Sequence, residues 1–391
     1  MKIPKHILPI IVFAQFTGTS LWFAGNAILP QIQTAWALPE NSIAQVTSSV
    51  MFGFILGTFA FALLSIADRF QPVKVFLACS LLGAVTNALL FFLPPTYLWL
   101  IVSRVLTGVF LAGIYPVGMK IAADWYGGKT GKALGYLVGA LVLGSAFPHL
   151  LNHFGANYSW KIVLAGTSIL AITGGFMMLF WVGDGPHRQK GNQFNPSRLF
   201  DVFRDKRFRT AAFGYFGHMW ELYTFWAFIP VALAYYNKTH DLALPISLWT
   251  FVIMGIGVVG CVFGGVISER MGSAKVAYRF LLTSGLLCIV SPFLYDLPAF
   301  VFLVGMLMWG FAVIGDSAQY SSLNAITAPP KLKGTALTIV VSIGFLLTIP
   351  SIQLMGYLQQ IINVKWLLFT LLIGPAFGLF HTRYLLNQKI T

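Results

Sequence analysis

Long apolar segments alternate with short polar segments along almost the whole chain. An apolar segment recurs about every 30 residues, and each is about 20 residues long, the length that a helix needs to cross a bilayer. The chain of 391 residues therefore has room for about a dozen such helices. The pattern predicts spans at 7–30, 43–66, 72–93, 97–120, 131–151, 160–182, 210–235, 245–267, 274–294, 297–323, 335–358 and 366–386.

One long polar stretch interrupts this pattern between the sixth and seventh predicted spans. It carries seven Lys and Arg residues against three Asp residues. We predict a six-helix bundle at 1–182, a basic cytoplasmic linker at 183–209 and a second six-helix bundle at 210–391. The linker is either an anchor against anionic lipid or a regulatory docking surface.

The two halves also match each other at an offset of about 200 residues. The loop segment Ala67–Phe70 with Lys74 recurs as Ser268–Met271 with Lys275. Two further matches have nearly the same offset: Ile28–Pro30 with Phe228–Pro230, and Gly131–Leu134 with Gly334–Leu337. Duplicated membrane halves place a substrate path where the repeats meet, so the duplication predicts a carrier.

The composition excludes a soluble domain. Hydrophobic residues make up 57% of the chain and charged residues 9%, whereas soluble domains carry roughly 25% charged residues. The three cysteines, Cys79, Cys261 and Cys288, are dispersed in apolar segments, a pattern that indicates neither disulfides nor a metal site. We therefore expect no metal and no cofactor.

The net charge of +14 reflects membrane orientation and does not indicate nucleic-acid binding. With the amino terminus inside, 21 of the 25 Lys and Arg residues fall on the inner side of the predicted spans. This asymmetry follows the positive-inside rule. It predicts a multi-pass membrane protein with both termini in the cytoplasm and a retained first helix.

The loop segments and one intramembrane arginine motif resemble those of the major facilitator superfamily, and the resemblance covers the whole chain. The matching residues are Asp68, Arg69 and Lys74, then 265–275, then Arg104–Gly108. The resemblance implies an all-α membrane protein of twelve transmembrane helices in two pseudo-symmetric bundles. It also implies alternating access, a bacterial inner membrane and a monomer. Ala122–Tyr126 followed by Gly131–Leu134 resembles the nitrate/nitrite- and cyanate-porter branches.

The two loop copies are predicted to form a cytoplasmic gate, as the resemblance implies. A carboxylate at a helix end is stabilised against the positive amino terminus of another helix, and a nearby arginine adds charged hydrogen bonds. The alternative is that these charges mark the lipid headgroup boundary. The predicted gate residues are Asp68, Arg69, Lys74, Glu269, Arg270 and Lys275.

Two carboxylates and a histidine are candidates for proton coupling. Glu221 lies about 12 residues beyond Arg209, which is ~18 Å into a core ~30 Å thick. His218 is three residues earlier and shares its helix face. A buried carboxyl can load and release a proton, and an imidazole can relay it. Asp316 is either a second coupling or substrate site, or a residue of the inner gate.

Arg104 is the candidate for recognition of the solute charge. It lies ~10 Å below the outer surface, where a charge is costly and functional by default. It is either the counter-charge of an anionic solute or an internally paired residue, in which case the carboxylates suit a cationic or zwitterionic solute. The other predicted substrate-binding residues are Asn26, Trp22, Tyr223 and Trp226.

The function predicted from these features is proton-coupled secondary transport of a small polar organic solute, with an organic anion favoured. The alternative is a proton-driven efflux antiporter for drugs or metabolites, which the aromatic residues would suit. An enzyme is not expected, because no Walker loop, nucleophile motif or dense His/Asp cluster is present. The linker of 27 residues is short for a sensor domain.

Overall fold

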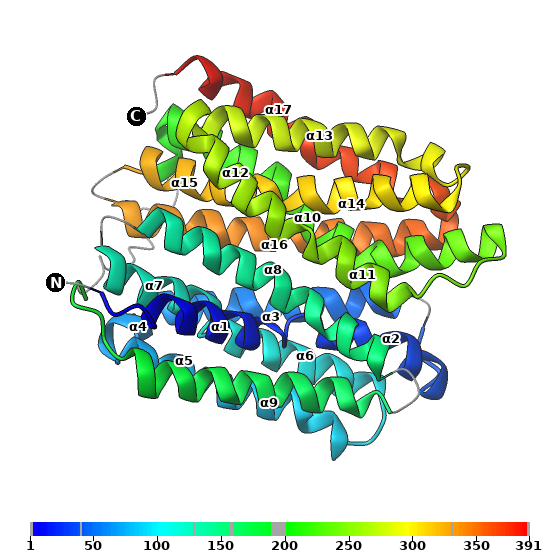
Figure 1. Ribbon diagram of the computed structural model, residues 1–391, viewed down its shortest axis with the longest axis horizontal. Coiled ribbons are helices and arrows are strands. Elements are labelled where there is room, and N and C mark those ends of the chain that lie inside the picture. Colours follow the sequence, from blue (N-terminus) through cyan, green and yellow to red (C-terminus); the bar gives the residue numbers. More distant parts are fainter. Residues whose placement is uncertain are drawn as a thin grey trace. The chain divides into compact units, whose positions relative to one another are not determined.

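Every regular element in the described part of the chain is a helix. The computed structural model describes residues 3–39, 41–127, 130–155, 159–188, 201–329 and 332–388. The chain divides into two compact units, Met1–Gly191 and Asn192–Thr391. In each unit the helices run roughly along a common direction (Figure 1). Residues 189–200 of the predicted linker lie outside the described residues.

The first unit contains α1 to α9 with two short distorted turns. The bounds are α1 Ile7–Thr19, α2 Ala24–Ala35, α3 Ser42–Leu63, α4 Ile66–Arg69, α5 Pro72–Ala88, η1 Leu89–Phe91, α6 Tyr97–Leu111, α7 Tyr115–Tyr126, α8 Thr130–Phe154, α9 Lys161–Met177 and η3 Met178–Val182.

The second unit contains α10 to α17 with several short 3-10 turns. The bounds are η5 Asp201–Arg204, α10 Lys206–His240, α11 Ile246–Gly255, α12 Gly257–Met271, α13 Ser273–Leu294, α14 Ala299–Gly315, α15 Ser317–Thr327, α16 Lys333–Ile361, η7 Val364–Trp366, η8 Leu368–Leu372, α17 Ile373–Thr382 and η9 Arg383–Asn387.

Eleven helical segments in the described residues are long and apolar enough to cross a membrane, and they coincide with eleven of the twelve predicted spans. The twelfth prediction, 210–235, lies within α10, which is 35 residues long. His218 and Glu221 stand in the middle of α10 and make its central turns polar. Ionisable residues inside a spanning helix are rare and mark function, so α10 is a candidate location of the functional site.

Several spans are broken near their middles. The first span is interrupted between α1 and α2, the fourth between α6 and α7, the eighth at Ile256 and the tenth at Asp316. A helix break leaves backbone groups without intrahelical partners, and such breaks are tolerated in membranes where the backbone is buried in protein or lines a cavity. Transporters commonly place their binding groups at such discontinuities.

The two units repeat one packing order. In the first unit α3 packs on α6, α1 packs on α8 and α9, and α5 packs on α9. In the second unit α12 packs on α14, α10 packs on α16 and α17, and α13 packs on α17. The same sequence of spans is therefore joined by the same contacts, and the match between halves in sequence extends to the fold.

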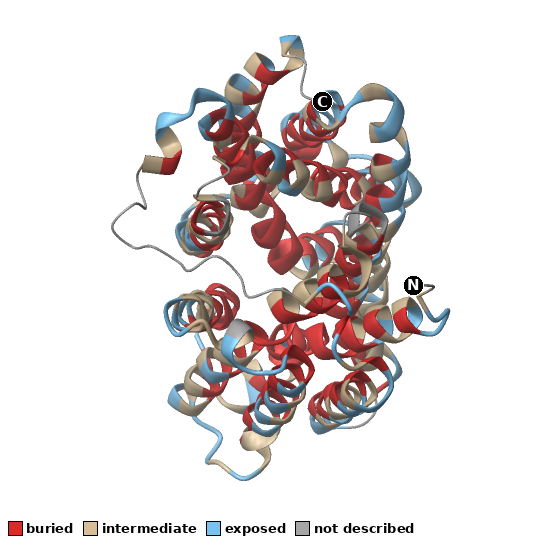
Figure 2. Ribbon diagram, turned by 90° about the vertical axis from the view of Figure 1, so that its left-hand side faces the viewer, coloured by how far each residue is buried: buried red, intermediate tan, exposed pale blue. Residues whose placement is uncertain are grey.

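Glycines permit the closest crossing in each unit. A Cβ atom on Gly53 or Gly108 would collide with a carbonyl oxygen of the facing helix, α6 or α3. Gly260 and Gly310 stand in the same relation to α14 and α11 in the second unit. Small residues let helix backbones approach where lipid provides no hydrophobic driving force. Most helices also carry buried residues on one side and exposed residues on the other (Figure 2).

Candidate functional site

Glu221 is buried in the second unit among side chains that donate hydrogen bonds to it. Its carboxyl is 1% exposed. The Oε1 atom accepts hydrogen bonds from Trp309 Nε1 at 2.7 Å, from Cys288 Sγ at 3.6 Å and from Ser284 Oγ. These donors come from α13 and α14. A buried carboxyl is costly without such partners, so this cage lets Glu221 stay in the membrane interior.

His218, one helical turn before Glu221 on α10, is in contact with Asp316. His218 Nδ1 lies 2.8 Å from Asp316 Oδ1, and both side chains are 1% exposed. Asp316 stands at the break between α14 and α15. The rings of Tyr215 and Tyr320 lie 6.0 and 6.1 Å from the imidazole centroid. Asp316 Oδ1 accepts no hydrogen bond of ordinary geometry among the described residues, so the contact is an ion pair when the imidazole is protonated.

The three residues predicted for proton coupling therefore lie together, but they form two separate clusters. In the described part of the chain no hydrogen bond joins His218 to Glu221. His218 Nε2 has no hydrogen-bond partner among the described residues. The imidazole and Asp316 are close enough to Glu221 to interact with it electrostatically. A direct relay between His218 and Glu221 stays a prediction.

The first unit has no ionic pair at the equivalent position. His218 lies 200 residues after Gly18, and Asp316 lies 202 residues after Ile114. Gly18 and Ile114 are also in contact, because a Cβ atom on Gly18 would meet the Ile114 side chain. The same crossing of helices is thus apolar in one unit and ionisable in the other.

Arg104 is completely buried in the first unit and is held by neutral groups. Its Nη2 donates to Asn87 Oδ1 at 2.6 Å and to Thr107 Oγ1 at 3.3 Å. Its Nη1 lies 3.5 Å from the Leu21 carbonyl oxygen at the α1–α2 break, a long hydrogen bond. Arg104 Nε has no partner, and no carboxylate pairs with the guanidinium among the described residues. The internal contacts fix the side chain without neutralising its charge.

Asn87 is the residue that organises this network. Its Nδ2 atom donates to the Leu164 carbonyl at 3.1 Å and contacts Thr167 and Ser168 of α9 at 3.0 Å. The Asn87 amide is therefore held from α9 while its oxygen faces Arg104. This arrangement positions the guanidinium between α5, α6 and the α1–α2 break.

The remaining predicted substrate residues divide between the units. Asn26 Nδ2 donates to Thr47 Oγ1 at 2.6 Å, and Trp22 packs on Phe54 with centroids 4.9 Å apart. Trp22 lies within the α1–α2 break, Asn26 lies in the first turn of α2, and Arg104 contacts the break through the Leu21 carbonyl. Tyr223 and Trp226 lie on α10 of the second unit, with their rings 5.5 Å apart. All five predicted residues are buried.

The predicted gate residues lie at helix ends. Arg69 is the last residue of α4 and Lys74 is in the first turn of α5. In the second copy, Glu269 and Arg270 are in the last turn of α12 and Lys275 is in the first turn of α13. Arg69, Lys74, Glu269, Arg270 and Lys275 are exposed, and no ion pair involves them among the described side chains. The side chain of Asp68 lies outside the described residues. The first loop copy is in contact with the chain that follows α9, because a guanidinium nitrogen of Arg188 donates to the Phe70 carbonyl at 3.0 Å.

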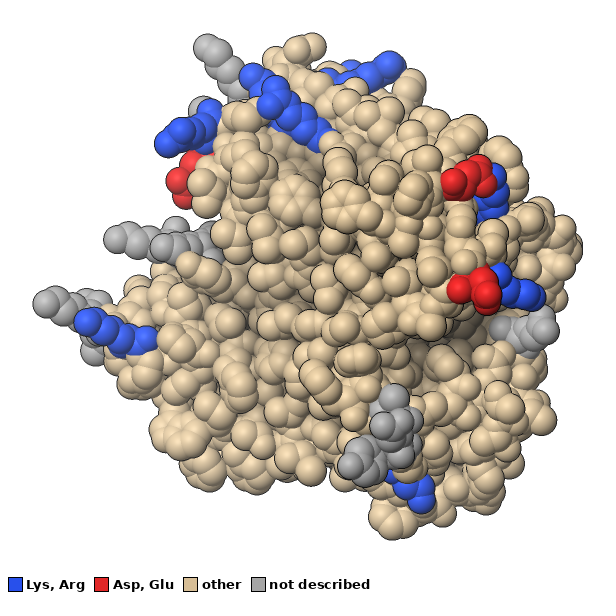
Figure 3. Space-filling model, turned by 45° about the vertical axis from the view of Figure 1, so that its right-hand side comes forward, with Lys and Arg blue, Asp and Glu red and all other residues tan. Residues whose placement is uncertain are grey.

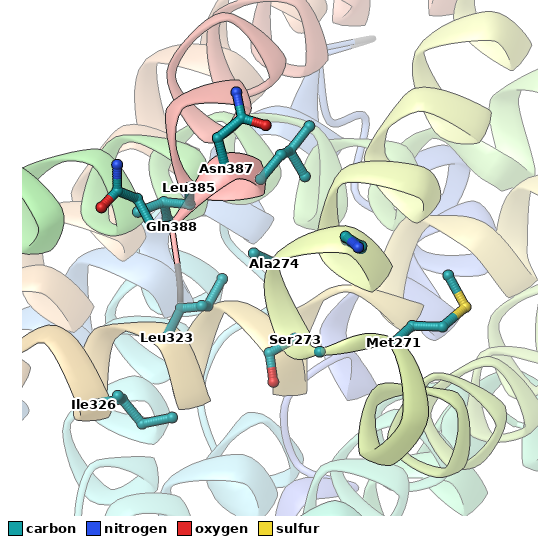
Figure 4. A pocket seen from close by; sticks show the side chains of 11 residues that line it. Met271, Ser273, Ala274, Leu323, Ile326, Leu385, Asn387 and Gln388 are labelled. Carbon is teal, nitrogen blue, oxygen red and sulfur yellow. The ribbon is translucent and has the colours of Figure 1, made fainter. Parts of the chain in front are cut away.

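The second loop copy borders a pocket of about 360 Å³. Gly272 turns the chain between α12 and α13 with a φ of 84°, a value that favours glycine. The pocket is also lined by the end of α15 and by η9 with its following residues (Figure 4). Its lining is largely apolar, with Lys275 as its one charged residue, so the pocket has no pair of opposite charges.

Sequence reasoning missed the side chains that surround the predicted groups. Asn87 carried a signal, because it is an amide near the end of a predicted span. Ser284 and Trp309 carried none, since a serine and a tryptophan in apolar helices are compatible with ordinary packing. Cys288 carried no such signal either, since its pattern indicated neither a disulfide nor a metal site, and the structure places its thiol 3.6 Å from Glu221 Oε1.

Two six-helix repeats with broken spans and buried ionisable groups define an integral membrane protein of the transporter class. The family model for the Major Facilitator Superfamily matches residues 11–349. The chain belongs to this superfamily, so the family that the loop motifs predicted is confirmed.

Similar proteins are transporters by name and by fold. The chain is 22% identical over 267 residues to the uncharacterized MFS-type transporter YybF of Bacillus subtilis, covering 64% of this chain and 62% of that protein. It is 23% identical over 299 residues to the probable sulfoacetate transporter SauU of Cupriavidus necator, covering 68% and 69%. The solved xylose transporter XylE from E. coli matches with a TM-score of 0.73 and 15% identity over 97% of each chain, which supports the fold.

Proposed function

We propose that the protein is a proton-coupled secondary transporter of a small polar organic anion that works by alternating access. The observation that supports coupling is the buried set of Glu221, His218 and Asp316 in the second unit. Ionisable residues in spanning segments of transporters commonly mark proton relays. The equivalent first-unit contact of Gly18 with Ile114 has no ionisable group, so the pair is not a requirement of the fold.

Glu221 is the proposed proton carrier. The three donors to Oε1 stabilise the carboxylate, whereas burial favours the protonated carboxyl. These opposed effects are the condition for a group that changes protonation state when water reaches it. His218 and Asp316 tune the field at Glu221, and a change of charge on either one alters the balance.

Arg104 is the proposed counter-charge of the solute. Its contacts with Asn87, Thr107 and Leu21 orient the guanidinium but leave its positive charge uncompensated among the described residues. A carboxylate or sulfonate would supply that charge, and a guanidinium binds such groups with paired hydrogen bonds. The Cupriavidus necator relative is named a probable sulfoacetate transporter, and this likeness supports an organic anion as the solute. The likeness to the nitrate/nitrite- and cyanate-porter branches also stays a prediction.

The proposal also includes the gate and the orientation. Asp68, Arg69 and Lys74 with their second copy would close the cytoplasmic side, and both termini would lie in the cytoplasm. The positive-inside distribution supports this orientation in a bacterial inner membrane. The working unit is proposed to be a monomer with domains at 1–182 and 210–391.

The test is uptake into proteoliposomes that carry the full chain. We expect an inward proton gradient to drive accumulation of an organic anion such as sulfoacetate. Glu221→Gln should lose gradient-driven accumulation while keeping its fold. Asp241→Asn is the matched control, because Asp241 is an exposed carboxylate at the end of the same helix.

Three outcomes would contradict parts of the proposal. Unchanged gradient-driven uptake by Glu221→Gln removes Glu221 from coupling. If an organic anion raises the thermal unfolding temperature of Arg104→Gln as much as that of the unsubstituted protein, Arg104 does not take part in recognition of the solute. Uptake that fails for anions, together with proton-driven export of lipophilic cations, favours the efflux antiporter.

A further inference from the structure

A group of three cationic residues lies in the second unit, where the start of α10 meets the end of α17. Lys206 Nζ lies 4.2 Å from the centroid of the Tyr384 ring, and Arg383 Cζ lies 4.2 Å from that of Phe380. Arg209 and Arg383 both act electrostatically on His381. Residues distant in the sequence thus bring three cationic side chains to one end of one bundle. We call Lys206, Arg209 and Arg383 the basic cluster.

The basic cluster has no acidic partner in the described part of the chain. Asp205, the nearest acid in sequence, caps α10, because its Oδ1 accepts the backbone N–H groups of Arg207 and Phe208 at 2.8 and 3.0 Å. Asp201 lies 3.4 Å from Arg204. The nearby carboxylates are therefore engaged elsewhere, and the cluster keeps an excess of positive charge that an external anion would neutralise.

An exposed apolar strip leads along α17 to the basic cluster. Ile373, Phe377 and Phe380 recur at helical spacing on one face and are 56%, 44% and 58% exposed. Arg383 follows three residues after Phe380. The face of the molecule shown in Figure 3 has a wide uncharged area, with Lys, Arg, Asp and Glu side chains toward its margins. An apolar strip that ends in cations matches a molecule with an acyl chain and an anionic head.

We propose that this end of the second unit binds an anionic phospholipid of the surrounding bilayer. The phosphodiester would lie among Lys206, Arg209 and Arg383, and an acyl chain would follow Ile373, Phe377 and Phe380. The aromatic rings beneath Lys206 and Arg383 keep those cations at the level of the headgroups. A soluble phosphate would use the cations but not the strip, so the strip favours lipid. This inference does not depend on the proposed transport function.

The test measures lipid binding to the purified full chain in detergent by native mass spectrometry. Phosphatidylglycerol and phosphatidylcholine, with matched acyl chains, are titrated separately. Each cation near an anionic headgroup contributes roughly fivefold in binding. Arg209→Gln combined with Arg383→Gln should therefore weaken phosphatidylglycerol binding roughly thirtyfold. Phosphatidylcholine binding should change little.

Matched variants separate the cluster from general charge. Lys161→Gln combined with Lys238→Gln removes the same charge from exposed positions outside the cluster and should leave phosphatidylglycerol binding unchanged. Arg209→Lys combined with Arg383→Lys keeps the charge and should restore most of the binding, which also guards against misfolding. Phe377→Ser should weaken binding of the long-chain lipid.

The proposal is overturned by equal losses for both lipids, or by equal losses in the cluster and control variants. It is also overturned if inorganic phosphate at millimolar concentration displaces phosphatidylglycerol, since that result assigns the cluster to a soluble anion.

Discussion

A double-mutant cycle on His218 and Asp316 tests whether the buried pair is a specific interaction. The substitutions are Asp316→Asn, His218→Gln and both together. The contact is 2.8 Å long and both side chains are 1% exposed, so values for exposed ion pairs, about 0.2–1 kcal/mol, do not apply. Breaking a buried charged pair costs about 3–5 kcal/mol when one charge remains unpaired. Imidazole can lose its proton, and the interaction is then at most that of a neutral hydrogen bond, about 0.5–1.5 kcal/mol.

The expected coupling energy is therefore about 2–3 kcal/mol if the pair is charged and about 1 kcal/mol if it is neutral. The assay is denaturant unfolding in detergent micelles, followed by far-UV circular dichroism. A control cycle pairs His218→Gln with Asp241→Asn, whose carboxylate is exposed at the end of α10, and should give no coupling. A coupling for His218 and Asp316 within about 0.3 kcal/mol of zero would refute the reasoning.

Three further substitutions test local features of the fold and the site. Asp205→Ala removes the side-chain cap of α10 and should lower the unfolding free energy by about 1 kcal/mol, whereas Asp205→Asn should not; equal losses in denaturant unfolding would exclude capping. Gly272→Ala places a side chain at a φ of 84° and should cost about 1 kcal/mol or more, so an unchanged unfolding midpoint would contradict the strain argument. Gly53→Leu should separate α3 from α6 and prevent stable folding, which size-exclusion chromatography of the detergent-solubilised protein would reveal; a monodisperse, fully active variant would contradict the close crossing.

The recurrence of long apolar segments was sufficient to predict the fold, because the bilayer restricts the possible structures. A spanning segment must satisfy its backbone hydrogen bonds internally, so each long apolar run must be a helix. The same rule explains why α10 was found despite His218 and Glu221, since its length and its place in the repeat compensate for its polarity. Helix breaks were not predicted. Gly255 and Gly257 flank the break at Ile256, but glycine is frequent in membrane helices, so it does not by itself tell a break from close helix packing.

The candidate site residues that carry a charge could be predicted, because charged residues are rare inside a membrane. The residues that surround them could not be predicted, because their residue types are common in membrane helices. Glu221, Asp316 and Arg104 were identifiable because charged residues are costly at depth. Their partners were not, because Trp309 and Ser284 have common packing roles in apolar helices. The pairing of His218 with Asp316 joins residues 98 positions apart, and only the crossing of α10 with the α14–α15 break brings them together.

The comparison of equivalent positions explains how one repeated bundle acquires two chemistries. The Leu21 carbonyl accepts from Arg104 in the first unit, and the residue 200 positions later is Glu221. Thr107, which contacts the arginine, lies 202 positions before Trp309, which donates to Glu221. The shared scaffold therefore carries a buried cation in one unit and a buried carboxyl in the other. In the proposed function, the carboxyl of one unit binds the proton and the cation of the other unit binds the anion. Substitutions at Glu221 and Arg104 should consequently affect coupling and solute binding separately.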